Sequence, residues 1–235
     1  MGLPIRLGVP VLLCGFALAQ SQPDVKGILE KVSDTYKAAS EYEIVMDMIR
    51  TNSGTGKQEA THQLVAVKTP DRYRVESPDR KDQGGKTLKG LLVVFDGATL
   101  WFYDPGSNRY NSFPAAAIGT DLPDELEVSG VDYGTMSRFR EASKNAVAAS
   151  FLRAEEIAIG GAKVGCYVVS LRQGNSQFVW WVDRANSHVV REDTQDEGDN
   201  ISTIFATVTL RGPLPSGLFT FAPPAGAQKG APDQR

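Results

Sequence analysis

Two histidines are the first residues to test for chemistry, because imidazole serves both as a metal ligand and as a general base. His62 and His188 lie far apart in the sequence, and neither belongs to an H-E-x-x-H or C-x-x-C pattern, so no zinc site is predicted. The sequence also lacks G-x-S-x-G, the turn that presents a nucleophilic serine in α/β-hydrolases. We therefore expect a protein that is not an enzyme and that needs no metal or other cofactor.

Two further stretches contain residue types that bind cations or phosphate. One is the acidic run that consists of Glu192, Asp193, Asp196, Glu197 and Asp199. Its acids do not fall at the alternate positions of an EF-hand loop, so a solvated hairpin tip is favoured over a calcium site. The other is GGKT at residues 84–87, but Arg80 stands where a Walker A loop needs a glycine, so a phosphate loop is rejected.

The stretch Leu91–Pro105 (LLVVFDGATLWFYDP) offers a different chemistry, an apolar binding surface. Asp96-Gly97 is typical of a two-residue type I′ hairpin turn. Closure at that turn places Val93 opposite Leu100 and leaves apolar residues on both faces, so we expect the hairpin to be covered on both sides. Two interpretations stay open: a central hairpin of a β-sandwich, or a sheet whose second apolar face receives a lid or a hydrophobic ligand.

The elements around this hairpin are one helix and a series of strands. Apolar residues at helical spacing predict an amphipathic helix over Pro23–Ala39 that packs in the core. Strands are predicted over Tyr42–Arg50, His62–Thr69, Arg72–Ser77, Asn108–Phe113, Leu152–Ile159, Val164–Leu171, Phe178–Val182, Val189–Asp193 and Ile201–Leu210. Strands at such regular spacing, separated by turn signals, indicate an antiparallel sandwich or barrel.

Residues 114–150 interrupt the strands with prolines, acids and alanine-rich stretches. Within them Gly134–Ala149 is weakly helical, with Met136, Phe139 and Val147 as its apolar anchors. This insertion is interpreted either as a plain surface excursion or as a cover over one face of the sheet.

Three short sequence motifs occur in a characteristic order: VKTPDRYRVESP at 67–78, DGATLWFYDP at 96–105 and GLFTFAPPAGA at 217–227. In this order and spacing they resemble the periplasmic outer-membrane lipoprotein carrier family, the LolA-like proteins, over most of the chain after residue 19. WWVDRANSHVVRE at 180–192 fits the same pattern. The resemblance implies an α+β fold, in which a strongly curved antiparallel sheet forms an unclosed β-barrel covered by an N-terminal helix and a mid-chain helical lid.

The resemblance also implies a function, the binding of lipoprotein acyl chains or a related lipid in a hydrophobic cavity during transport to the outer membrane. Tyr73 matches the family's aromatic position, and strand alternation puts Val75 on the same face. The residues expected to line the cavity are Met46, Met48, Val65, Val67, Tyr73, Val75, Trp101 and Tyr103, and those expected in the lid are Met136, Phe139 and Val147. The expected partners are lipids and membrane proteins of the inner and outer membrane, and the chain is expected to be a monomer.

The chain departs from the family pattern at one position. Where LolA-like carriers have an arginine that latches the lid, this sequence has Thr69, although Arg72 is nearby. A related lipid-binding role therefore stands beside lipoprotein sorting. The alternative is a periplasmic sensor of the RseB type, a regulatory binding module on the same fold. Such sensors usually carry a second domain, for which this chain has little room.

Residues 1–19 are typical of a secretory signal peptide: Arg6 precedes the apolar core Leu7–Leu18, and Ala17-Leu18-Ala19 forms the cleavage site. A lipid anchor on Cys14 is disfavoured, because Leu13 before it is not a small residue. We therefore expect export to the periplasm and cleavage before residue 20.

Composition limits the remaining possibilities. Residues 20–224 are expected to form one domain, followed by a disordered tail over 225–235 that is rich in glycine, alanine, proline and charge. The net charge of −3 argues against a nucleic-acid partner, which requires a basic surface. Cys166 is the one cysteine left after cleavage, and its apolar neighbours predict a small buried hydrophobe.

Overall fold

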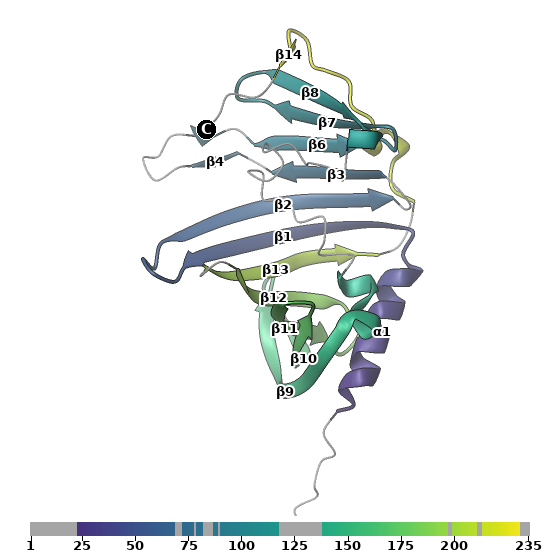
Figure 1. The fold of residues 1–235 in the computed structure, drawn as a ribbon, viewed down its shortest axis with the longest axis vertical. Helices are drawn as coiled ribbons and strands as arrows, with labels where there is room; N and C mark the ends of the chain where they lie inside the picture. The colour runs from purple at the N-terminus through teal and green to yellow at the C-terminus, as the bar shows by residue number, and fades with distance from the viewer. Residues whose placement is uncertain are drawn as a thin grey trace, which may run out of the picture.

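The structure is a computed structural model that describes residues 23–68, 72–77, 79–81, 87–88, 90–117, 138–196, 199–210 and 213–230. One 12-stranded sheet, in the order β14-β8-β7-β6-β3-β2-β1-β13-β12-β11-β10-β9, forms its main body (Figure 1). The strands of this sheet are β1 (Glu41–Asn52), β2 (Gln58–Lys68), β3 (Arg72–Ser77), β6 (Leu91–Phe95), β7 (Thr99–Asp104), β8 (Arg109–Pro114), β9 (Ala146–Ile159), β10 (Ala162–Gln173), β11 (Ser176–Asp183), β12 (Val189–Asp196), β13 (Asp199–Thr209) and β14 (Gln228–Lys229). A small second sheet pairs β4 (Arg80–Lys81) with β5 (Thr87–Leu88).

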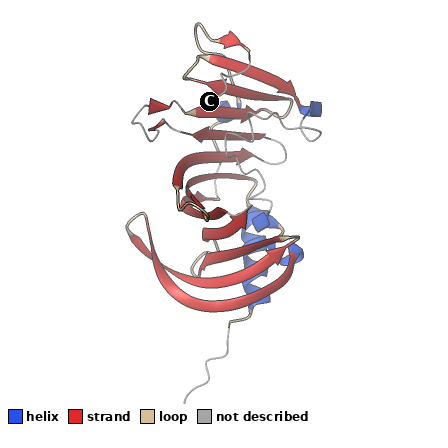
Figure 2. Ribbon diagram, turned by 60° about the vertical axis from the view of Figure 1, so that its left-hand side comes forward, coloured by secondary structure: helices blue, strands red, loops and turns tan. Residues whose placement is uncertain are grey.

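The large sheet is strongly curved and does not close on itself, since β14 and β9 end the strand order (Figure 2). Its neighbouring strands pair antiparallel, except for the parallel pair of β14 with β8. Among the described residues, the helical ones are α1 (Val25–Ala38), residues 138–140, α4 (Ala142–Asn145) and the short 3-10 turns η1 (Ala115–Ala117) and η2 (Ser216–Phe219). The predicted α+β fold with one unclosed, curved antiparallel sheet is therefore confirmed.

Helix α1 confirms the predicted N-terminal helix. Asp24 caps its first turn, because the carboxylate accepts a hydrogen bond from the backbone N–H of Lys26. The residues that α1 buries are Ile28, Leu29, Val32, Ser33 and Tyr36. The Tyr36 hydroxyl accepts a hydrogen bond of 3.2 Å from the backbone N–H of Val189 on β12, which ties the helix to the sheet. Burial raises the pKa of Tyr36 far above its usual range, so this phenol stays neutral.

The central hairpin forms from β6 and β7, but its register differs from the predicted one. Phe95 pairs with Leu100, so four residues rather than two form the turn. The Asp96 carboxylate accepts hydrogen bonds from the backbone N–H groups of Ala98 and Thr99, an arrangement that favours the longer turn. Because the register shifts by an even number of residues, each side chain stays on its predicted face.

Alternation along the strands gives the sheet two faces. The inner face is the one that carries Tyr42, Ile44 and Met46 of β1, which share a buried cluster with α1. Strand pairing extends the inner face from Ile44 to Val65 and from there across β3, β6 and β7. The outer face is the opposite one.

Helix α1 lies over the inner face at β1 and β10–β13, which we call the packed half (Figures 1 and 2). Phe139 fills the same half, because it belongs to the same buried cluster. The buried sheet residues of the packed half are Tyr42, Ile44, Met46, Val169, Leu171, Phe178, Trp180, Val182, Val189 and Phe205. On the outer face behind it lies a second buried group that includes Cys166, Val168 and Trp181. Cys166 is thus the small buried hydrophobe that was predicted.

Two segments differ from the sequence-based expectation. β9 begins at Ala146 rather than at Leu152, so helix α4 is reduced to four residues within the weakly helical stretch.

The chain after Pro224 is ordered as far as Gly230, because Gln228 and Lys229 pair with β8 and the Gly230 N–H donates to the Tyr110 carbonyl. The predicted disorder of residues 225–230 is therefore wrong; residues 1–22, with the proposed signal peptide, and 231–235 lie outside the described part of the chain.

Candidate functional site

The candidate site is the part of the inner face that lies away from α1, on β2, β3, β6, β7 and β8 (Figure 1). We call it the open half. Its buried members are Val75, Val93, Leu100 and Phe102, and its half-buried members are Val65, Tyr73, Leu91, Phe95 and Phe113. All nine side chains are apolar or aromatic, so this surface can bind a ligand through the hydrophobic effect and offers no nucleophile.

Cross-strand register holds the aromatic side chains of the open half together. Tyr73 pairs with Phe95, and their ring centroids are 5.3 Å apart with the rings tilted by 39°. Directly beside them Val75 pairs with Val93. The inner face therefore presents a continuous apolar strip, with the half-buried rings of Tyr73 and Phe95 at one end of it.

The structure brings most of the predicted cavity residues onto one face. Val65, Val67, Tyr73 and Val75 lie on the inner face, where Val65 pairs with Val75 and Val67 with Tyr73. Met46 is on the same face but is buried in the packed half, and alternation along β1 places the half-buried Met48 two residues further along the inner face. Whether these side chains touch a ligand stays a prediction.

Trp101 and Tyr103 do not belong to this group. They alternate with Leu100 and Phe102 along β7 and therefore lie on the outer face. There the C-terminal segment covers them: the Phe221 ring is 5.5 Å from that of Trp101 and 5.7 Å from that of Tyr103. Their assignment to the cavity is wrong, because a segment more than a hundred residues away in sequence covers that face.

The same C-terminal segment explains why the hairpin is apolar on both faces. Phe219 of η2 is fully buried, and the Leu218 carbonyl accepts a hydrogen bond from the Arg74 guanidinium on β3. The Trp101 indole N–H donates to the Asp96 carboxylate at 3.1 Å. Partial burial raises the pKa of Asp96, but the hydrogen bonds that its carboxylate accepts outweigh burial and hold the pKa below its usual range.

The three predicted lid residues lie in three different places. Phe139 is fully buried in the packed half, edge-on to Trp180 at 5.0 Å and to Phe205 at 5.4 Å between ring centroids. Val147 lies on β9 with 66% of its surface exposed. Met136 is outside the described residues. The assignment of Phe139 and Val147 to a lid is therefore wrong, and Phe139 is a fixed part of the core.

A charged anchor next to Phe139 was missed from the sequence. Glu192, only 3% exposed, accepts hydrogen bonds of 2.8 Å from the Arg138 guanidinium and 2.7 Å from the Trp180 indole N–H. The Arg138 guanidinium carbon also lies 5.0 Å from the centre of the Phe178 ring. Residues 138 and 139 thus fix the end of the 114–150 insertion to the packed half. In the sequence, Glu192 belonged to an acidic run and gave no sign of a buried partner.

The lid latch has no described counterpart. Thr69 lies outside the described residues, and Arg72 on β3 is exposed. Alternation with Tyr73 places Arg72 on the outer face, so Arg72 does not take the latch position on the inner face.

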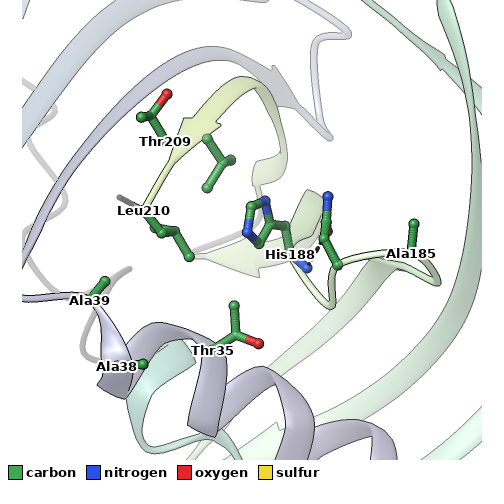
Figure 3. A pocket seen from close by; sticks show the side chains of 9 residues that line it. Thr35, Ala38, Ala39, Ala185, His188, Thr209 and Leu210 are labelled. Carbon is green, nitrogen blue, oxygen red and sulfur yellow. Dashed lines mark hydrogen bonds between the residues drawn. The ribbon is translucent and has the colours of Figure 1, made fainter. Parts of the chain in front are cut away.

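A cavity of about 750 Å³ opens near the last turn of α1 (Figure 3). It lies between that turn, the connection from β11 to β12 and the end of β13, and Thr35, His188 and Leu210 are directed toward it from these three places. Its walls also contain Ala38, Ala39, Ala185, Asn186, Val208 and Thr209. It contains no acid–nucleophile pair and none of the predicted cavity residues.

The described residues limit other chemistry in two ways. Among the described residues, no group of three or more histidine, cysteine, aspartate or glutamate side chains is placed to hold a metal ion. Within the same part of the chain, no helix has the length and apolar character needed to cross a membrane.

Comparison with known proteins identifies a family and a distant relative. A family described as predicted periplasmic protein, DUF2092, matches residues 26–230. An uncharacterized protein of Methanocaldococcus jannaschii is 24% identical over 217 residues, which are 91% of this chain and 56% of that protein. This chain thus spans about half the length of that relative.

Similar solved structures include a LolA superfamily protein from Nitrosomonas europaea (TM-score 0.43, 15% identity, 85% of this chain and 98% of that one). An uncharacterized conserved protein from Thermus thermophilus gives a TM-score of 0.48 with 14% identity, over 87% of this chain and 97% of that one. A chain in the MucA/MucB complex of Pseudomonas aeruginosa gives a TM-score of 0.39 with 14% identity, over 85% of this chain and 62% of that one. These are likenesses of fold alone, and they include the family that the sequence motifs predicted.

Proposed function

The chain belongs to the DUF2092 family of predicted periplasmic proteins, and on that premise we propose that it is a periplasmic carrier of lipoprotein acyl chains or a related lipid. The ligand lies against the open half of the inner face. One observation carries this proposal: Tyr73 and Phe95 stay half-buried beside the buried Val75 and Val93, on a face whose other half is filled by α1 and Phe139.

The energetics of such a site suit a carrier. An acyl chain that buries about a dozen methylene groups gains roughly 10 kcal/mol at ~0.8 kcal/mol each. Association and ordering remove several kcal/mol of that gain. The remaining affinity is useful but reversible, and a carrier needs both properties because it must release its cargo to an acceptor. No charged contact is required, which agrees with the apolar composition of the open half.

The test introduces a charge into the open half. Tyr73→Glu and Phe95→Glu each place a carboxylate where the acyl chain is proposed to lie, and burial of an unpaired carboxylate costs several kcal/mol. We expect both variants to lose binding of a fluorescent fatty acid, measured by titration. Mass spectrometry of organic extracts should detect lipid with the purified wild-type protein and little with the variants.

A matched control separates lost binding from lost folding. Ile49→Glu makes the same charge change at a side chain that is 40% exposed on the outer face of β1. Thermal unfolding is measured for all three variants. A folded Tyr73→Glu protein that binds the fatty acid as well as wild type does would overturn the assignment of the ligand to the open half.

A further inference from the structure

The two ends of the large sheet are treated differently. At one end, the parallel pairing of β14 covers part of β8, with hydrogen bonds from Gln228 N–H to the Asn108 carbonyl and from Gly230 N–H to the Tyr110 carbonyl. At the other end β9, 14 residues long, pairs with β10 on one side and is the last strand of the sheet within the described part of the chain. A long free edge strand presents unpaired backbone donors and acceptors to other chains.

Two β-bulges shape this edge. Pairing with β10 passes from Ala146 to Ala148 and from Phe151 to Arg153, so the inserted residues are Val147 and Leu152. These are also two of the three large hydrophobic side chains that are exposed among the described residues, with exposed fractions of 66% and 46%. Bulges often serve to turn an edge away from other strands, but here they present apolar side chains at the edge.

The composition of β9 does not protect it either. Natural edge strands are usually guarded by lysine, proline or inward-pointing charges. The run Ala146–Leu152 (AVAASFL) contains none of these, and its positions 147 to 150 are all exposed. The flanking charges Lys144 and Arg153 lie outside the run. Such an uncharged, exposed strand favours pairing with another strand over staying free.

We propose that β9 pairs antiparallel with β9 of a second copy of the chain, which makes the protein a homodimer rather than the monomer expected from the sequence. A two-fold interface must bring a surface patch against itself. A two-fold axis through Ala149, the middle residue of the run, pairs all seven uncharged residues with one another. The same axis keeps Arg153 of one copy away from Arg153 of the other. Within each copy, Arg153 already donates hydrogen bonds of 2.8 Å to Glu155 on the same strand.

The pairing leaves the proposed ligand surface free. β9 lies at the end of the strand order opposite to β6, β7 and β8, so each copy keeps its own open half. The proposal therefore does not rest on lipid binding, and either one can fail without the other.

Sedimentation velocity over micromolar to near-millimolar concentrations tests the dimer. We expect wild-type protein to shift from monomer to dimer, and the double variant Val147→Lys/Leu152→Lys to stay monomeric with unchanged thermal unfolding, because the lysines are solvated in the monomer. Ile49→Lys is the matched control: it alters the third exposed hydrophobic residue, away from the edge, and should dimerise like wild type.

Cysteine cross-linking tests the register. Ala149→Cys lies at the two-fold axis and should give a disulfide-linked dimer under oxidation, whereas Ala158→Cys, an exposed alanine near the far end of the same strand, should not. A wild-type chain that is monomeric throughout the concentration range overturns the proposal, even if its edge binds an extended peptide of another protein. A double lysine variant that still dimerises overturns it as well.

Discussion

In the packed half of the inner face, Phe139 and α1 close over Trp180 and Phe205, whereas in the open half Tyr73 and Phe95 lie against each other and stay half-buried. Both halves belong to one sheet and one face, and both are built from aromatic and β-branched residues. The difference comes from what is placed on top of them. A surface for a hydrophobic ligand therefore cannot be located by the apolar content of its strands alone.

The largest expected effect is on the packed half. Phe139→Ala removes a fully buried ring that contacts Trp180 and Phe205, and such a truncation costs about 3–5 kcal/mol. Denaturant unfolding should show this loss, while Val147→Ala, at an exposed position of β9, should stay within about 0.5 kcal/mol of wild type. A loss of less than about 1 kcal/mol for Phe139→Ala would mean that the packed half is not filled as described.

Ligand should stabilise the open half. A fatty acid at about 100 times its Kd raises the free energy of unfolding by about 2.7 kcal/mol if it binds only the folded protein. Hydrogen exchange should then slow in β3, β6 and β7 and change little in β10–β12. Slowing that is confined to β10–β12 would place the ligand in the packed half and reverse the comparison.

The charged anchor should matter less than Phe139 but clearly more than a surface pair. Glu192→Gln weakens the hydrogen bonds from Arg138 and Trp180 at a buried position, with an expected cost of about 1.5–3 kcal/mol. The control is Asp193→Asn, which weakens the half-exposed pair with Arg191 on the other face and should cost no more than about 1 kcal/mol. Equal costs for the two variants would show that Glu192 does not anchor the insertion.

The smallest effect concerns Cys166 on the outer face behind the packed half. Burial raises the pKa of the Cys166 thiol to about 11, so at pH 8 it should react with a disulfide reagent roughly 100-fold more slowly in the folded than in the unfolded protein. The thiol has a higher pKa in the folded than in the unfolded protein. The neutral thiol therefore contributes fully to the free energy of unfolding below about pH 8.5, and this contribution is lost as the pH rises toward 11. Fast labelling of folded protein, at the rate of an exposed Ala158→Cys thiol in a Cys166→Ser background, would show that this outer cluster is open.

Local patterns were enough to predict the parts of the fold that depend on periodicity. The helical spacing of Ile28, Leu29, Val32 and Tyr36 predicted α1 and its buried side, and alternation assigned Tyr73 and Val75 to one face. The hairpin was predicted with the correct faces but the wrong turn, because the Asp96 carboxylate stabilises a four-residue connection.

Which residues share a face was therefore predictable from local sequence, since side-chain direction follows from helix and strand geometry within a few residues. What covers each face depends instead on contacts between segments that are distant in sequence. Phe221 reaches Trp101 from the C-terminal segment, and Arg138 meets Glu192 across more than fifty residues of sequence. Such contacts depend on how distant segments pack together, a choice that many apolar or charged residues of the chain satisfy equally well at the level of sequence.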